Sequence, residues 1–143
     1  MYLISACLVG VNCRYNGENT LDERLVGLIE SGKAIAVCPE VLGDLPIPRE
    51  PCEIIKNGDK TQKVISESGK DYTRSFFKGA AKTLEICKII GIKKAILQSR
   101  SPSCGYGKIY DGTFSGTLIE GNGVTAELLD KNGIKVFNEE NWS

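Results

Sequence analysis

Three cysteines of this chain follow short apolar segments that are typical of buried β-strands. Parallel strands of one sheet end at the same edge, roughly 5–10 Å apart for strands that are close neighbours. Three thiols at such an edge can therefore converge on one cofactor, and thiolates are ligands of zinc ions and of iron–sulfur clusters. The residues are Cys7 after residues 2–6, Cys38 after 33–37, and Cys104 in the serine-rich loop that follows 94–97.

The other cysteines and the lack of histidine limit which metal sites and which proton-transfer groups the chain can have. The chain has six cysteines and no histidine, so proton transfer must use carboxylates, cysteine, lysine, tyrosine or water. No C-x-x-C pair occurs, which argues against a zinc ribbon or a thioredoxin-type motif. We interpret Cys87, on the apolar face of an expected helix, and Cys52, beside Pro51, as structural, and leave Cys13 open. Cysteine is also a common small buried hydrophobe, so the residues alone leave a shared site and ordinary core thiols as alternatives.

The elements that must position these thiols alternate between short strands and helices. Apolar runs predict strands, and helical periodicity predicts helices, of which the first would be capped by Asn19 or Thr20. Residues 1–143 are therefore expected to form a single-domain three-layer α/β/α fold with a mostly parallel, Rossmann- or flavodoxin-like sheet. The first strand would lie between the second and third, with the last strand beyond the third, so that a topological switch point separates the first and third. The expected strands are 2–6, 33–37, 94–97 and 134–137, and the helices are 21–31, 73–90 and 122–131.

Residues 39–66 interrupt this alternation. Four prolines and Gly43 within residues 39–51 predict an irregular, rigid segment, either a functional loop or a structural wrap. Two apolar runs, 54–55 and 63–66, flank Asn57-Gly58-Asp59 and predict a small β-hairpin.

Overall charge and hydropathy exclude several classes of protein. Eighteen basic and eighteen acidic residues cancel, so we expect no extended nucleic-acid surface and no membrane-surface footprint. No apolar run approaches the ~20 residues of a membrane span, and the first residues lack the pattern of a signal peptide. We therefore expect a cytoplasmic protein without a membrane partner, either a monomer or a small homo-oligomer.

Several motifs, in order along nearly the whole chain, resemble those of the TudS-type thiouracil desulfurases, a family formerly described as a domain of unknown function. The chain departs from the usual pattern at Asn16, where the family often has aspartate, so a charge at that place is lost. The motifs are Ser5-Ala6-Cys7-Leu8-Val9-Gly10, Cys13-Arg14-Tyr15-Asn16-Gly17, Cys38-Pro39-Glu40, Leu45-Pro46-Ile47-Pro48-Arg49, Ser99-Arg100-Ser101-Pro102-Ser103-Cys104-Gly105 and Gly121-Asn122-Gly123-Val124-Thr125-Ala126.

The resemblance implies a cofactor, a substrate and a reaction. Family enzymes hold a 4Fe-4S cluster by three cysteines, which match Cys7, Cys38 and Cys104. The remaining iron is free to take the sulfur of a thiolated nucleobase such as 2-thiouracil, and oxygen from water replaces that sulfur. The catalytic carboxylate and serine of the family match Glu40 and Ser101.

The residue types agree with those roles. Replacing C=S by C=O needs a Lewis acid for the sulfur and a proton shuttle for the water. Glu40 lies two residues after Cys38, and Ser101 three residues before Cys104, so both would lie beside the cofactor. Without the resemblance, the carboxylate would be interpreted as a solvated loop side chain and the serine as a turn cap. Further substrate-binding candidates are Arg14, Tyr15, Arg49, Ser99 and Ser103.

Two other interpretations remain from the sequence. One keeps the metal site without catalysis, as an iron–sulfur or zinc-binding module for sulfur handling or sensing. The other is a cofactor-free nucleotide-binding domain, in which Gly105-Tyr106-Gly107 and Gly121-Asn122-Gly123 open helices onto phosphate. The second is weakly supported because neither glycine cluster forms a complete G-x-G-x-x-G fingerprint after a first strand.

Overall fold

A parallel sheet forms the centre of the computed structural model, which describes residues 1–56 and 62–143. Within those ranges the sheet has four strands in the order β2-β1-β5-β8. The predicted order is therefore confirmed, and the switch point lies between β1 and β5, both of which run parallel. The strands are β1 (Tyr2–Ser5), β2 (Ala34–Val37), β5 (Lys94–Ile96) and β8 (Lys135–Phe137).

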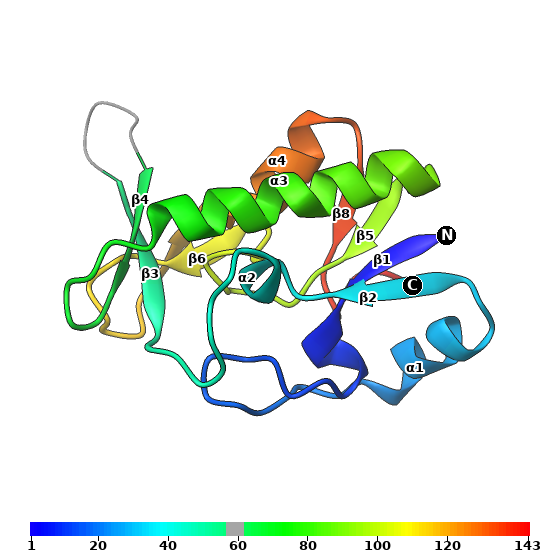
Figure 1. The fold of residues 1–143 in the computed structure, drawn as a ribbon, viewed down its shortest axis with the longest axis horizontal. Helices are drawn as coiled ribbons and strands as arrows, with labels where there is room; N and C mark the ends of the chain where they lie inside the picture. The colour runs from blue at the N-terminus through cyan, green and yellow to red at the C-terminus, as the bar shows by residue number, and fades with distance from the viewer. Residues whose placement is uncertain (57–61) are drawn as a thin grey trace.

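Helices cover both faces of this sheet, as Figure 1 shows. Alternate residues of β1 point to opposite faces, so Leu3 packs in the core shared with α3 and α4, whereas Ile4 packs in the core shared with α1. The predicted three-layer α/β/α arrangement is confirmed. Of the helices in the described residues, none is both long and apolar enough to cross a lipid bilayer. The covering helices are α1 (Glu23–Glu30), α3 (Thr73–Ile90) and α4 (Val124–Lys131).

The ends of the helices follow local capping chemistry. α1 begins two residues later than predicted, because Asp22, and not Asn19 or Thr20, is its cap: the Asp22 carboxylate accepts the Arg24 N–H at 3.0 Å. α3 ends where predicted, at Gly91, whose φ of 84° lies in the left-handed region that favours glycine. The chain then turns directly into β5.

The proline-rich segment differs from its prediction. Pro39–Leu42 forms one helical turn, α2, although residues 39–51 were expected to be irregular. Proline is compatible with the first position of a helix because its missing N–H has no partner there in any case. After β1 the chain also forms a short 3-10 helix, η1 (Ala6–Val9).

Two antiparallel hairpins lie beside the central sheet. β3 (Cys52–Lys56) and β4 (Gln62–Ser66) confirm the predicted hairpin, whereas its predicted turn at residues 57–59 lies outside the described residues. The second hairpin, β6 (Lys108–Tyr110) and β7 (Leu118–Glu120), was not predicted.

Two glycines let α2 lie directly on α3. A Cβ on Gly79 would lie 1.8 Å from the carbonyl oxygen of Pro39, and a Cβ on Gly43 would lie 2.1 Å from that of Ser75. Real side chains do not approach backbone so closely, so both positions need glycine for this packing. Since α2 carries Glu40, the long helix fixes the place of that carboxylate.

Candidate active site

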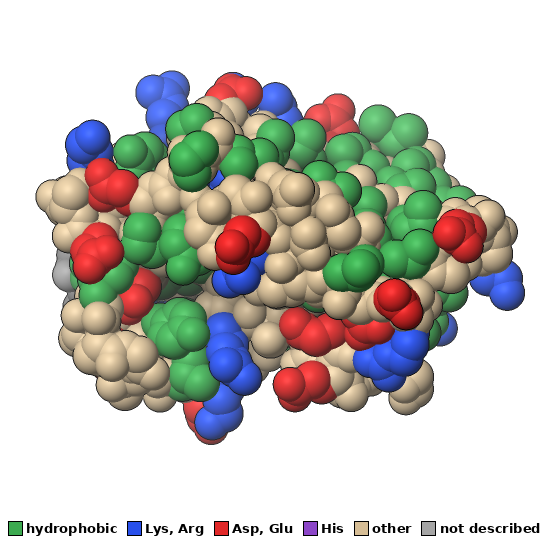
Figure 2. Space-filling view, turned by 90° about the horizontal axis from the view of Figure 1, so that it is seen from below, with side chains coloured by type: hydrophobic (Ala, Val, Ile, Leu, Met, Phe, Trp, Pro, Cys, Tyr) green, Lys and Arg blue, Asp and Glu red, His purple; other side chains and the backbone are tan. Residues whose placement is uncertain are grey.

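A cleft of about 660 Å³ opens where β1, β2 and β5 end, and the hairpins form its other side. All ten side chains that the sequence suggested for the cofactor, catalysis or the substrate line this cleft. Figure 2 shows the surface hollowed in the left half of the view, where hydrophobic side chains meet side chains of both charges. The fold therefore gathers the candidate residues at one place.

Five thiols line the cleft, and four of them come from the ends of the parallel strands and the loops that follow them. Cys7 lies in η1 directly after β1, Cys38 directly follows β2, and Cys104 comes from the loop after β5. Cys13, whose role the sequence left open, lies in the same cleft and is only 3% exposed. Throughout the part of the chain that the structure describes, all six cysteines are free thiols.

Cys13 changes the acidity of its two neighbours. Hydrogen bonding with the Cys13 thiol is the main cause that lowers the pKa of Cys7 and lowers that of Cys38 to about 7. The same hydrogen bonds, with Cys38 as the stronger partner, raise the pKa of Cys13 above its usual range. Cys38 is thus partly ionised near neutral pH, whereas Cys13 keeps its proton.

Cys104 lies deeper and in different surroundings. Burial raises the pKa of its thiol to about 12, although two hydroxyls act in the opposite direction. Ser5 donates a hydrogen bond to the Cys104 sulfur at 3.3 Å, while the Ser103 hydroxyl, whose single proton is donated to Glu40, lies 3.6 Å from that sulfur. A hydroxyl that donates a hydrogen bond to the sulfur stabilises a thiolate once a metal has replaced the thiol proton.

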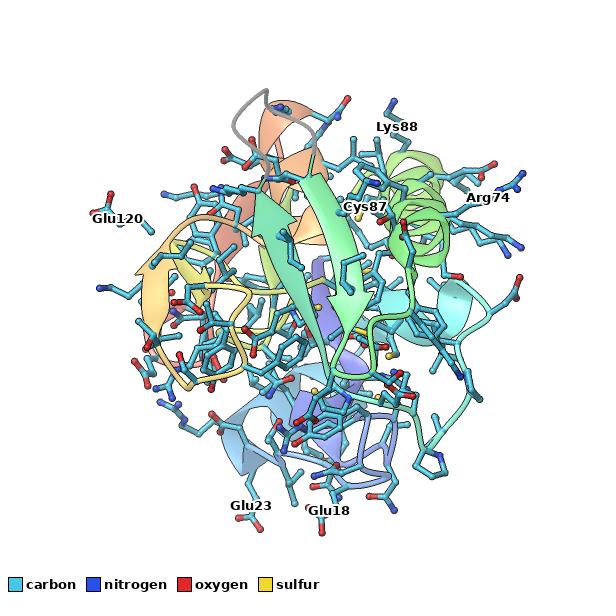
Figure 3. The ribbon with its side chains drawn as sticks, turned by 90° about the vertical axis from the view of Figure 1, so that its left-hand side faces the viewer. Glu18, Glu23, Arg74, Cys87, Lys88 and Glu120 are labelled. Carbon is cyan, nitrogen blue, oxygen red and sulfur yellow. The ribbon has the colours of Figure 1, made fainter. Side chains whose placement is uncertain are left out.

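The remaining cysteines divide between cleft and core. Cys52 opens β3 and lines the cleft, and burial raises the pKa of its thiol to about 12. Cys87 belongs to the core between α3 and the sheet, and burial raises its pKa to about 11. Figure 3 shows Cys87 on α3, whereas Glu18, from the loop that carries Cys13, points outward at the opposite edge.

Glu40 is fixed at both of its carboxylate oxygens. Arg49 Nε donates to Oε1 at 3.1 Å, and Ser103 Oγ donates to Oε2 at 2.8 Å. Arg49 is itself anchored, because its two Nη atoms donate to the carbonyl oxygens of Pro46 and Cys13 at 3.0 and 2.8 Å. Only 7% of the arginine side chain and 15% of the glutamate side chain are exposed, so this is a largely buried ion pair.

A line of hydroxyls connects Glu40 to Ser101. The Oγ atoms of Ser101 and Ser103 are 3.2 Å apart, and Ser103 bonds the carboxylate. Ser101 Oγ also accepts the N–H of Cys104 at 2.7 Å, which fixes the loop that carries this thiol. Of the residues proposed to bind substrate, Arg49 and Ser103 thus have strong partners within the protein.

The other substrate-binding candidates lie at the rim of the cleft. Ser99 is held by Glu139 of the C-terminal tail, which accepts its N–H at 2.9 Å and its hydroxyl at 3.3 Å. The Arg14 guanidinium lies over the Tyr15 ring, 5.7 Å from its centre, and 39% of Tyr15 is exposed. Their binding of substrate stays a prediction.

The donor set suits a cluster better than a single ion. Among the described residues, no three His, Cys, Asp or Glu side chains are close enough together to hold one metal ion. Thiolates on one tetrahedral zinc would need sulfur atoms about 3.8 Å apart, given Zn–S bonds of about 2.3 Å. An iron–sulfur cluster places its cysteines on separate irons, and soft thiolates are its usual ligands. By the chemistry of their donor atoms, the thiols of the cleft are thus of the kind that binds an iron–sulfur cluster.

The structure adds cleft residues that the sequence analysis missed. Gln98 Oε1 accepts the Cys7 S–H at 3.4 Å, and Ser5 joins the Gln98 N–H to the Cys104 thiol. Both are polar residues at the ends of apolar strands, so the predicted strand ends could have indicated that they line the cleft. Glu53 and Phe114, from the hairpin region, also line the cleft and had no such signal.

The fold and the site together define an α/β protein with a thiol-lined cleft at the switch point of its sheet, where proteins of this class bind ligands. The chain belongs to the 2-thiouracil desulfurase family, an enzyme family whose model matches residues 2–141. The resemblance that the motifs indicated is thereby confirmed.

Two relatives cover almost the full chain. The uncharacterized protein YbbK of Bacillus subtilis (strain 168) is 46% identical over 144 residues, which cover 97% of this chain and 95% of YbbK. A solved structure of the 4Fe-4S-dependent thiouracil desulfidase TudS is similar with a TM-score of 0.90 and 43% identity. That similarity covers 99% of this chain and 91% of the TudS chain.

Proposed function

We propose that this chain uses a 4Fe-4S cluster to replace the sulfur of a thiolated nucleobase, such as 2-thiouracil, with oxygen from water. Membership of the desulfurase family and the similarity to TudS support this proposal. The observation that carries it is the meeting of three strand-end thiols in the same cleft as a buried, doubly anchored carboxylate. The thiols are Cys7, Cys38 and Cys104, and the carboxylate is that of Glu40.

The three thiols would hold the cluster and leave one iron without a protein ligand. When bound, the cluster supplies a Lewis acid for the sulfur of the substrate. Hydrogen bonding with Cys13 favours the ionised, ligating forms of Cys7 and Cys38, and Ser5 donates a hydrogen bond to the sulfur of Cys104.

The chain's own residues would move protons. Exchange of C=S for C=O by water releases H₂S and transfers no net electrons, so a base must take a proton from the water. Glu40 is the candidate base, because its carboxylate faces the cleft and is held in one place by Arg49 and Ser103. Ser101 would orient the water or the base through its hydroxyl, which reaches Glu40 by way of Ser103.

Iron and sulfide analysis tests the cofactor. Protein purified or reconstituted without oxygen should hold about four irons and four sulfides per chain. Cys7→Ser, Cys38→Ser and Cys104→Ser should each lose the cluster, whereas the core variant Cys87→Ser is the matched control and should keep it. Zinc alone in the wild type, or a Cys87 variant that empties the site, would contradict the assignment.

Turnover of 2-thiouracil, followed by its ultraviolet absorbance, tests the reaction. Glu40→Gln keeps the shape of the side chain and should keep the cluster, but should lower kcat by about 10²–10⁴-fold, the usual contribution of a general base. A loaded wild-type protein without turnover would favour a sulfur-handling module over an enzyme of this substrate. Full activity of the glutamine variant would remove Glu40 from the mechanism.

A further inference from the structure

The loop between β6 and β7, residues 111–117, presents an aromatic side chain in an unusual backbone conformation. Phe114 has a φ of 57°, in the left-handed region. Bulky residues other than glycine rarely occur there, because the side chain approaches the backbone too closely. Such a conformation persists only where neighbouring structure holds it, and residues of this kind cluster at active sites and ligand-binding segments.

A buried carboxylate of the other hairpin holds this loop. Glu53 of β3 is only 9% exposed, and its Oε1 accepts the N–H groups of Gly112 at 2.9 Å and of Phe114 at 3.2 Å. Gly112 also lies so close to β3 that a Cβ there would be 2.9 Å from the carbonyl oxygen of Ile54. The loop is thus docked on β3 at the two residues that determine where the Phe114 ring lies.

The consequence is an aromatic wall on the hairpin side of the cleft. Phe114 is half-buried and lines the cleft together with Tyr110 at the end of β6, while Tyr15 lines it from the loop after η1. Most of the other side chains that line the cleft carry thiols, hydroxyls or charged groups. A flat apolar ring makes few favourable contacts with such polar side chains, but it offers a surface on which a planar heterocycle can stack.

We propose that Phe114 determines specificity by stacking against the face of the thiolated base, and that Glu53 is the positioning residue that aims its ring. The inference rests on the proposed function, because it names a contact to the substrate of that reaction. It assigns the hairpin region, which holds none of the proposed cluster ligands, a role in choosing flat aromatic substrates.

Kinetics on the cluster-loaded enzyme test the stacking contact. Phe114→Ala should raise KM for 2-thiouracil about tenfold or more, the usual effect of removing one stacked ring, with kcat changed much less. Phe114→Tyr should stay near the wild type, and Phe114→Leu should be intermediate because it keeps apolar area without a π face. Phe77→Ala, which removes an exposed ring of α3, is the matched control and should leave KM unchanged.

Glu53→Ala tests the positioning role. It should raise KM as Phe114→Ala does, and the double variant should be no worse than Phe114→Ala alone, since both changes remove one contact. A loss of stability without a change in KM would show that Glu53 has a structural role only. Fully additive KM effects would likewise refute the coupling.

Binding of uracil, the product, separates this inference from the proposed function. Calorimetry on the loaded protein should show uracil affinity reduced about tenfold by Phe114→Ala and unchanged by Phe77→Ala. Absence of turnover in the wild type would refute the proposed function. The effect of Phe114→Ala on uracil affinity would then still show whether the Phe114 ring contacts the base. Unchanged uracil affinity and unchanged KM in Phe114→Ala would overturn the inference.

Discussion

Replacing Arg49 by methionine should cost this protein a large part of its stability. The guanidinium forms a largely buried pair with Glu40 and also donates to the carbonyl oxygens of Pro46 and Cys13. Removing one partner of a buried ion pair typically lowers the free energy of unfolding by about 3–5 kcal/mol, because the other charge stays buried without compensation. Methionine keeps most of the side-chain volume, so this loss is not caused by a cavity.

The magnitude can be worked out from the contacts. With 7% of Arg49 and 15% of Glu40 exposed, water reaches the orphaned carboxylate only in part. The remaining Ser103 hydrogen bond keeps the loss below the upper limit, so we expect about 3 kcal/mol. For a domain of this size, that corresponds to a fall in Tm of roughly 10 °C.

Urea unfolding followed by circular dichroism, at equal iron content for all variants, measures this loss. A double-mutant cycle with Glu40→Gln then isolates the ion pair, because glutamine removes the charge that Arg49→Met leaves unpaired. The double variant should be more stable than the sum of the single losses predicts, by about 1–3 kcal/mol. Additive effects, or a loss below about 1 kcal/mol for Arg49→Met, would refute the reasoning.

Two other substitutions compare surface and close packing by the same unfolding assay. Lys78→Met removes the ion pair with Asp44, in which the lysine side chain is 48% exposed and the aspartate side chain 67%. The free energy of unfolding should change by less than about 0.5 kcal/mol, because water screens a pair this exposed. A larger loss would mean that water does not screen this pair. Gly79→Ala adds a methyl group where the carbonyl oxygen of Pro39 leaves no room. It should lower the free energy of unfolding by about 3 kcal/mol and also reduce turnover by displacing α2. A stable, active variant would show that α2 and α3 can separate freely.

The order of the sheet could be predicted because its information is local. Each strand is a short apolar run, each helix shows its own periodicity, and the rules for parallel connections leave few arrangements. The same rules place the residues after each strand at one edge of the sheet, so Cys7 and Cys38 could be assigned to a common cleft before the structure was known. Cys104 could be assigned with them for the same reason, although it lies several residues after β5.

The parts that could not be predicted depend on tertiary contacts. Pro39 was interpreted as a helix breaker, yet it begins α2, because a proline in the first turn lacks no hydrogen bond. The strands β6 and β7 are three residues long, and all of β7 is exposed, so no alternation marks them. Glu53 has the sequence pattern of an ordinary hairpin residue, and only the fold brings Gly112 and Phe114 to its carboxylate.

The contact between Ser5 and Cys104 has a consequence for how a cofactor would enter. These residues are 99 positions apart in the chain, so their hydrogen bond requires that β1 and β5 have already paired. The bonds that hold Glu40 likewise use only groups of the chain itself. Small zinc domains, by contrast, fold around their ion.

Under the proposed function, we therefore expect the chain to fold first and to take up its cluster afterwards. A chain made during iron shortage should then fold without the proposed cluster and remain able to bind it later. Oxidative loss of the proposed cluster should in the same way stop the proposed reaction without unfolding the chain, so that only the cofactor would need to be rebuilt.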